Sequence, residues 1–177
     1  NSQKLFSLWI PVCKRRRFFG MGKKMKKIEE VLSEIENSSQ QINVGIFKHR
    51  RSANSIPIIG RKKGSLLEEL IIKHKPKMIL EIGTLVGYSA ILMAQHLTNG
   101  RIISLEFDGK ATEKAQFYID KAGLSKKVKI IVGDAKQTIK LLDEKFDFVF
   151  IDAAKDEYFQ YLKLAENKIK KGAIIVA

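Results

Sequence analysis

The fold is decided by the stretch Met78-Ile-Leu-Glu-Ile-Gly-Thr-Leu-Val-Gly-Tyr-Ser89. Its first part, residues 78–82, is a mainly apolar run that is typical of a buried parallel strand. The run ends at Gly83, and Gly87 then begins a segment with apolar residues at helical spacing that extends to His96. The stretch therefore predicts a strand, a glycine loop and a helix, in that order.

This glycine loop can be a ligand site or a purely structural turn, and the stretch alone leaves both interpretations open. Glycines let the backbone turn sharply and approach a ligand closely, while the first free N–H groups of the next helix point towards it. Leu85 stands where a dinucleotide fingerprint has its second glycine, so the spacing disfavours NAD and FAD. Glu81, just before the loop, suits a ligand with a positive or hydrogen-bond-donating group, as in the amino acid end of S-adenosylmethionine (SAM).

From Lys77 onwards, apolar runs alternate with amphipathic segments. The expected strands are Lys77–Gly83, Arg101–Phe107, Val128–Val132, Phe146–Asp152 and Ala173–Val176. The expected helices are Lys26–Asn37, Gly64–His74, Gly87–Leu97, Lys110–Ala122, Ala135–Leu142 and Tyr158–Lys170, with an irregular loop over Ser38–Ile56. This alternation predicts an α/β protein with a doubly wound, mostly parallel sheet and helices on both faces.

The net charge of +14 is unevenly spread over the 177 residues. Residues 1–27 carry nine Lys or Arg and no acid, which leaves +5 for the rest. We expect residues 1–22 to be a basic leader, either an upstream extension or a disordered tail, and residues 23–177 to form the domain; an RNA-binding arm is the alternative. A single cysteine, Cys13, excludes an intramolecular disulfide, and no apolar run reaches membrane-spanning length, so we expect a cytoplasmic protein without a membrane partner.

Ligands of such sheets bind beyond the carboxyl ends of the strands, a rule that selects Gly83, Glu106, Asp134 and Asp152. Glu106 can accept two hydrogen bonds from ribose hydroxyls. Its alternative role is an acid at a helix N-terminus, a position that Asp108 fills better. Asp134 can accept a hydrogen bond from an adenine amino group or cap the next helix, and the sequence does not choose between the two.

Asp152 ends an apolar strand, and Lys155 follows three residues later. A hard oxygen ligand beside a lysine is what the magnesium-assisted deprotonation of a hydroxyl requires. The alternative is a salt bridge at the entry of a helix, in which Asp156 or Glu157 neutralises Lys155.

From about Gly60 to Ala177 the sequence resembles the class I SAM-dependent O-methyltransferases of the catechol and caffeoyl-CoA type. The resemblance rests on Gly64 with its helix, Leu80-Glu-Ile-Gly-Thr-Leu-Val-Gly-Tyr-Ser89, Glu106, Gly133-Asp134-Ala135 and Phe150-Ile-Asp-Ala-Ala-Lys155. It implies a Rossmann-like methyltransferase fold that binds SAM. By this likeness the methionine end is held by Glu81, Gly83, Tyr88 and Ser89, the ribose by Glu106, and the adenine side by Asp134 and Ala135. Asp152 would line the same site and bind Mg²⁺ or another divalent cation, and Lys155 would be the catalytic base.

The resemblance also implies features after Ala177. In the family, the strand that reads Gly172 to Ala177 here continues with Asp-Asn, which supplies the other two protein metal ligands, and a helix and two more strands follow. We therefore expect a fragment that lacks the last strands of the fold.

The function that the resemblance implies for the parent protein is metal-dependent transfer of a methyl group from SAM to a hydroxyl of a catechol-like small molecule, by a homodimer. A second hypothesis is methylation of 5-hydroxyuridine in tRNA, with the basic segments Lys48–Arg51 and Arg61–Lys63 against phosphates. The bland interpretation of Lys48–Arg51 is a solvated charge run. A third hypothesis is a cofactor-binding fragment without turnover.

Overall fold

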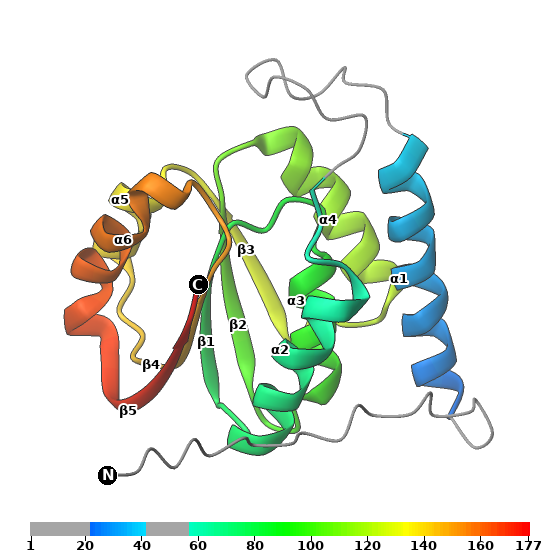
Figure 1. Ribbon diagram of the computed structural model, residues 1–177, viewed down its shortest axis with the longest axis horizontal. Helices are drawn as coiled ribbons and strands as arrows, with labels where there is room; N and C mark the ends of the chain where they lie inside the picture. The colour runs from blue at the N-terminus through cyan, green and yellow to red at the C-terminus, as the bar shows by residue number, and fades with distance from the viewer. Residues whose placement is uncertain (1–21, 42–56) are drawn as a thin grey trace, which may run out of the picture.

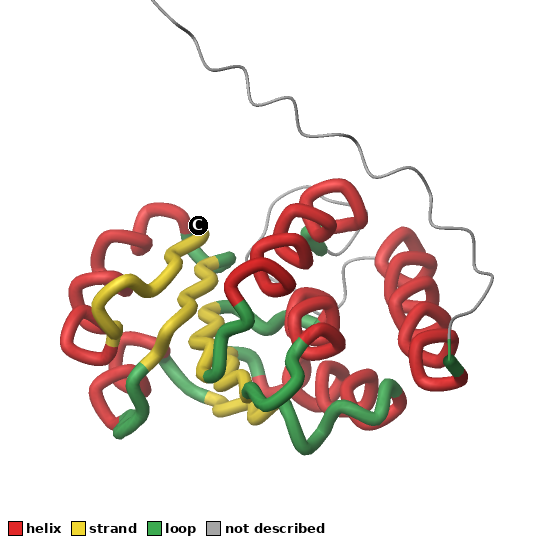
Figure 2. Tube along the Cα trace, turned by 90° about the horizontal axis from the view of Figure 1, so that it is seen from below, coloured by secondary structure: helices red, strands yellow, loops and turns green. Residues whose placement is uncertain are grey.

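The computed structural model describes residues 22–41 and 57–177, in which five parallel strands form one sheet between two layers of helices (Figure 1 and Figure 2). The predicted α/β class and doubly wound parallel sheet are confirmed. The strands are β1 (Met78–Ile82), β2 (Arg101–Glu106), β3 (Val128–Val132), β4 (Phe146–Ile151) and β5 (Ile169–Val176). The helices are α1 (Lys23–Gln41), α2 (Gly60–His74), α3 (Tyr88–His96), α4 (Gly109–Lys121), α5 (Ala135–Leu141) and α6 (Tyr158–Ala165), with short 3₁₀ turns η1 (Lys155–Glu157) and η2 (Glu166–Lys168).

The sheet has the strand order β3-β2-β1-β4-β5, so β1 lies at its centre. The chain runs outwards from β1 to β2 and β3 and then returns to place β4 on the other side of β1. Leu80 of β1 is therefore opposite Ile103 of β2 and Val149 of β4. This reversal is the topological switch point of the sheet, and ligands of such folds bind at the carboxyl ends of the strands beside it.

The two faces of the sheet carry separate apolar cores. Ile79 and Ile102 belong to the core that packs against α1 to α4, whereas Leu80 and Ile103 belong to the core that packs against α5 and α6. Figure 2 shows the two helical layers on opposite sides of the strands. Because the central strands are buried on both faces, they are apolar at nearly every position, and this is why the sequence predicted them well.

The first helix is longer than predicted. α1 extends to Gln41 and so includes four residues that we assigned to a loop. Ser38 and Ser39 are tolerated in the helix because their hydroxyls donate to the carbonyls of Ile35 and Glu36, one turn earlier. The remainder of the expected loop, residues 42–56, lies outside the described residues, as does the expected basic leader up to residue 21. Within the described residues, no helix has both the length and the apolar character needed to cross a membrane.

The last predicted helix was wrong at its carboxyl end. α6 stops at Ala165, and β5 begins at Ile169 instead of Ala173. Ile169 pairs with Phe146, and the register then shifts so that Ile174 pairs with Phe148. The extra residues of β5 form an irregularity at Gly172, whose φ is +81°. The lysines around Ile169 have the spacing of the polar face of a helix, and for this reason the sequence predicted a helix where β5 begins.

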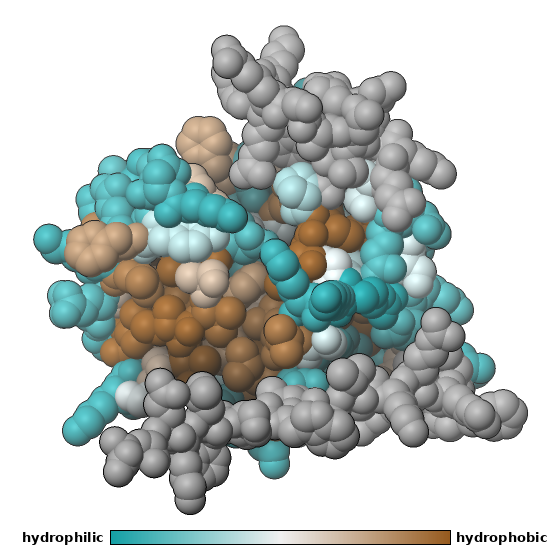
Figure 3. Space-filling model, in the orientation of Figure 1, coloured by the Kyte–Doolittle hydropathy of each residue, from teal (hydrophilic) through white to brown (hydrophobic). Residues whose placement is uncertain are grey.

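β5 forms one edge of the sheet and pairs with β4 on its inner side. Its side chains are less buried than those of β1, and Ile175 is 47% exposed. Figure 3 shows an apolar surface in the region where Figure 1 places the β4 and β5 ribbons. In Figure 3 this region is the largest continuous apolar area of the described residues.

Candidate functional site

Around Gly83 the carboxyl end of β1 contacts the carboxyl ends of β2 and β4. The N–H of Gly83 donates to the carbonyl of Leu105 at 2.9 Å, and that of Asp152 donates to the carbonyl of Ile82 at 2.9 Å. Gly83 has a φ of +99°, and a Cβ atom there would lie 2.3 Å from the carbonyl oxygen of Asp152. No side chain fits this position, so the glycine is required to bring the loop after β1 against the end of β4.

The next turn of this loop is held by Glu106. Leu85 has a φ of +51°, a conformation that is unfavourable for a residue with a side chain. Its N–H donates to one carboxylate oxygen of Glu106 at 2.7 Å, while the other oxygen accepts from the N–H of Asp108 at 2.9 Å. Asp108 itself caps α4 by accepting from two backbone N–H groups, as predicted. The half-buried Glu106 carboxylate is therefore not a helix cap, and its remaining lone pairs can accept further hydrogen bonds.

Glu81 is completely buried beneath the loop. Its two carboxylate oxygens accept from the hydroxyls of Ser89 and Ser104, each at 2.5 Å. Burial raises the pKa of Glu81 to about 7, against the opposing effect of the two serine hydroxyls. The carboxylate lies between β1, β2 and α3, and its hydrogen bond orients the hydroxyl of Ser89 at the start of α3. Its predicted contact with the methionine end of a cofactor stays a prediction, as does that of Ser89.

Ser104 is a site residue that the sequence analysis missed. It contacts Glu81, and its hydroxyl also lies 2.5 Å from that of Thr84 in the loop. A serine in the middle of the apolar strand β2, at 0% exposure, was the available signal, since a buried hydroxyl needs a partner.

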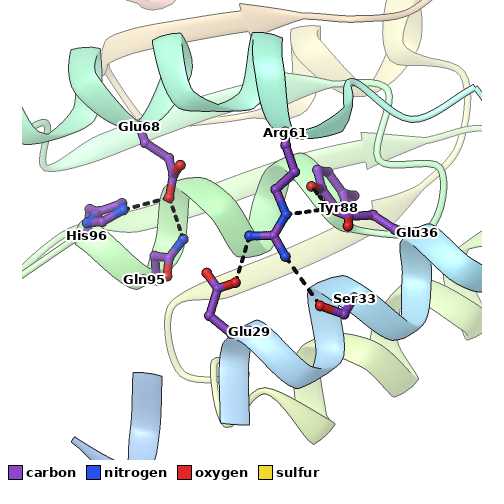
Figure 4. A network of polar contacts seen from close by, with 8 residues as sticks. All are labelled: Glu29, Ser33, Glu36, Arg61, Glu68, Tyr88, Gln95 and His96. Carbon is purple, nitrogen blue, oxygen red and sulfur yellow. Dashed lines mark hydrogen bonds and ion pairs between the residues drawn. The ribbon is translucent and has the colours of Figure 1, made fainter. Parts of the chain in front are cut away.

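Tyr88, the first residue of α3, directs its hydroxyl towards α1. The hydroxyl donates to the carboxylate of Glu36, which also accepts from Arg61 of α2 at 2.6 Å (Figure 4). A second nitrogen of the Arg61 guanidinium, Nη1, donates to the carboxylate of Glu29 at 2.7 Å. The network joins α1, α2 and α3 at the start of the glycine loop's helix. The predicted role of Tyr88 at the methionine end is untested, and the observed contact of its hydroxyl is with Glu36.

The same network bears on the tRNA hypothesis. Arg61 is neutralised by Glu29 and Glu36, so one of the three basic residues at 61–63 is already engaged in an intramolecular contact. Lys62 and Lys63 are exposed. The other basic segment of that hypothesis, residues 48–51, lies outside the described residues.

Asp134 caps α5, which confirms one of its two predicted roles. Its side chain accepts from the N–H of Lys136 at 2.8 Å, and α5 begins at Ala135. The N–H of Gly133 donates to the carbonyl of Glu106 at 2.8 Å, which places this turn beside the end of β2. Asp134 and Ala135 are therefore near Glu106, while their contact with an adenine stays a prediction.

Asp152 and Lys155 both lie at the surface beyond β4. The predicted alternative, an ion pair of Lys155 with Asp156 or Glu157, is not formed among the described residues, and Glu157 pairs with Lys136 instead. No group of three potential metal ligands occurs in residues 22–41 and 57–177. Asp152 is suited to be one ligand of a cation, but the described residues do not complete a metal site.

The site is acidic although the protein is strongly basic. Glu106 and Asp152 are close enough for their negative charges to raise the pKa of Glu81 further, after the larger effect of burial. Asp134 lies on the adjoining turn. This concentration of carboxylates above the switch point favours a ligand that carries positive charge or several hydrogen-bond donors.

Comparisons with known proteins agree on the family. The sequence matches the O-methyltransferase family over residues 46–177. It is 42% identical over 124 residues to a catechol O-methyltransferase of Niastella koreensis, an alignment that covers 67% of this chain and 56% of that protein. A catechol O-methyltransferase of Mycobacterium tuberculosis is 35% identical over 120 residues, with 67% and 54% covered.

Solved structures of O-methyltransferases have the same fold as this chain. An O-methyltransferase from Bacillus cereus in complex with SAH superposes with a TM-score of 0.67 and 30% sequence identity, over 85% of this chain and 64% of that chain. An O-methyltransferase of Streptomyces achromogenes in complex with SAM superposes with a TM-score of 0.71 and 26% identity, over 88% and 74%. The chain thus spans a little more than half the length of the two catechol O-methyltransferases above.

Proposed function

The chain belongs to the O-methyltransferase family, and from this premise we propose that its parent protein transfers a methyl group from SAM to a hydroxyl oxygen of a catechol-like small molecule. The observation that carries the proposal is the arrangement at the switch point, where Gly83, Glu106 and Asp134 surround the carboxyl ends of the central strands. Relatives named catechol O-methyltransferase support the class of acceptor.

The acidic character of the site supports SAM as the methyl donor. SAM carries a sulfonium and an ammonium group, and both are stabilised by nearby carboxylates. Glu106 has lone pairs left for the ribose hydroxyls after it has accepted from Leu85 and Asp108. The glycine loop lets the backbone approach the methionine end of the ligand.

In the proposed reaction, Lys155 takes the proton of the acceptor hydroxyl on its Nζ atom. The oxygen then attacks the methyl carbon, a C–O bond forms as the C–S bond breaks, and S-adenosylhomocysteine (SAH) leaves as a neutral thioether. The chain's contribution is to hold donor and acceptor in line and to keep a base beside the hydroxyl. A divalent cation held by Asp152 and by donors outside the described residues would lower the pKa of that hydroxyl. The described residues do not complete the site of this cation.

Calorimetry with SAH and with NAD tests the proposal. We expect SAH to bind and NAD not to bind. Glu106→Ala should weaken SAH binding by roughly 1–3 kcal/mol, the cost of unpairing hydrogen bonds to a charged group. The matched control is Glu113→Ala, which removes an exposed carboxylate from α4 and should leave the affinity unchanged. Equal SAH affinity in both variants would remove Glu106 from the site, whereas binding of NAD without binding of SAH would overturn the SAM assignment. Binding of SAH by this chain without methyl transfer would favour the third hypothesis, a cofactor-binding fragment without turnover.

A further inference from the structure

The turn that carries Lys155 is anchored by its last residue, Glu157. One carboxylate oxygen of Glu157 accepts from the Nζ atom of Lys136 at 2.6 Å, and the other accepts from the hydroxyl of Tyr161 at 2.5 Å. The N–H of Glu157 closes the turn on the carbonyl of Ala154 at 3.0 Å. Both oxygens and the backbone of this residue are therefore fixed.

The anchor joins two segments that the sheet itself keeps apart. Lys136 is in the first turn of α5, after β3, whereas Glu157 precedes α6, after β4. β2 and β1 lie between β3 and β4 in the sheet, so the strands that precede these two segments are three strand spacings apart, roughly 14 Å. α5 and α6 pack side by side on one face, and the ion pair connects their N-terminal ends next to the switch point.

Two neighbours show why this pair is well placed. The N–H of Lys136 donates to Asp134, so the lysine belongs to the turn that faces the predicted adenine side. Tyr161 is 6% exposed and belongs to the core between α5, α6 and the sheet. The hydrogen bond from Lys136 lowers the pKa of Glu157, as expected for a carboxylate held in its charged form. Lys155, in contrast, has no ion-pair partner among the described residues, so its position depends on the turn.

We propose that Glu157 is a positioning residue that, through Lys136 and Tyr161, fixes the turn bearing Lys155 relative to the turn at Asp134, where α5 begins. The inference rests on the proposed function, because it concerns the two turns, at Asp134 and at Lys155, that are proposed to line the SAM site. In this arrangement the base side and the adenine side move as one body. Neither Glu157 nor Lys136 needs to touch the reacting atoms for this.

The test measures SAH affinity and amide hydrogen exchange in the chain, in Glu157→Gln, in Lys136→Met and in the double variant. The matched control is Lys140→Met, which removes an exposed lysine from the same helix α5. We expect each single variant to weaken SAH binding by about two- to fivefold, the effect of losing a partly exposed ion pair, and the double variant to be no weaker than either. Exchange at residues 153–157 should rise at least about fivefold while the melting temperature stays within about 2 °C, a local effect that a general loss of stability would not give.

The outcomes separate the inference from the proposed function. Unchanged SAH affinity and unchanged exchange in Glu157→Gln, with SAH bound by the unmodified chain, would overturn the inference alone. Effects that multiply in the double variant would show that the two residues do not act as a pair, and would also overturn it. If the unmodified chain fails to bind SAH, the proposed function falls, and faster exchange of the turn in Glu157→Gln still decides whether Glu157 anchors it.

Discussion

Replacing Glu81 by glutamine should change how the stability of the protein depends on pH. Burial raises the pKa of this carboxyl from 4.5 to about 7 in the folded chain. Below pH 4.5 the carboxyl is protonated in both the folded and the unfolded chain, so its titration does not change the free energy of unfolding there. Between pH 4.5 and 7 the unfolded chain releases the proton while the folded chain keeps it, and the free energy of unfolding therefore falls as the pH rises. Above pH 7 this loss is complete.

The size of the effect follows from the shift in pKa. Each pKa unit corresponds to about 1.4 kcal/mol, so the buried charge costs on the order of 3 kcal/mol at pH 8. Glu81→Gln cannot ionise, and its amide can still form hydrogen bonds with Ser89 and Ser104. The assay is urea unfolding of both proteins at half-unit steps from pH 4 to pH 8. The free energy of unfolding of the variant minus that of the unmodified chain should rise by on the order of 3 kcal/mol over this range, because contributions of other groups cancel. A difference that does not change with pH would refute the reasoning.

Three other substitutions test the site. Gly83→Ala places a Cβ atom against the backbone after β4, so it should cost at least about 2 kcal/mol in urea unfolding and abolish SAH binding, whereas Gly109→Ala, with open space around it, should be neutral or slightly stabilising. Tyr88→Phe removes the hydrogen bond to Glu36 and should lower the free energy of unfolding by about 1 kcal/mol; an unchanged value would show that this contact does not hold α1. Lys155→Ala should reduce turnover of the parent protein by on the order of 10² to 10⁴ with SAH affinity intact, and full activity would remove Lys155 as the base.

The sequence predicted most of the fold because the central strands are buried on both faces. Their apolar runs cannot be mistaken for surface segments, and glycines separate β1 from the helix that follows it and β2 from the helix that precedes it. The boundaries of β1, β2 and β4 were predicted within one residue at each end. β5 was harder, because Lys168 just before this edge strand and Lys170 and Lys171 within it give the segment the same mixture of apolar and charged residues as a helix.

The site was predicted in part. Strand-end residues such as Glu106 and Asp152 follow from the position of the strands, so their place near the switch point was available from the sequence. Contacts between distant segments were not. Nothing near Tyr88 in the sequence indicates Glu36, and nothing near Glu157 indicates Lys136, because these pairs arise from how the helices pack on the sheet.

The pairing of β1 with β4 also sets the order in which the protein can fold. Leu80 and Val149 are opposite each other in the sheet but about 70 residues apart in the chain. Closing so long a loop is entropically costly, and contacts between distant residues form slowly. During synthesis, β1, β2 and β3 leave the ribosome well before β4, and until then the end of β1 lacks the backbone of Asp152 against which Gly83 packs. A nascent chain therefore cannot form this site early, and we expect ligands of the site to stabilise the last steps of folding and not the first.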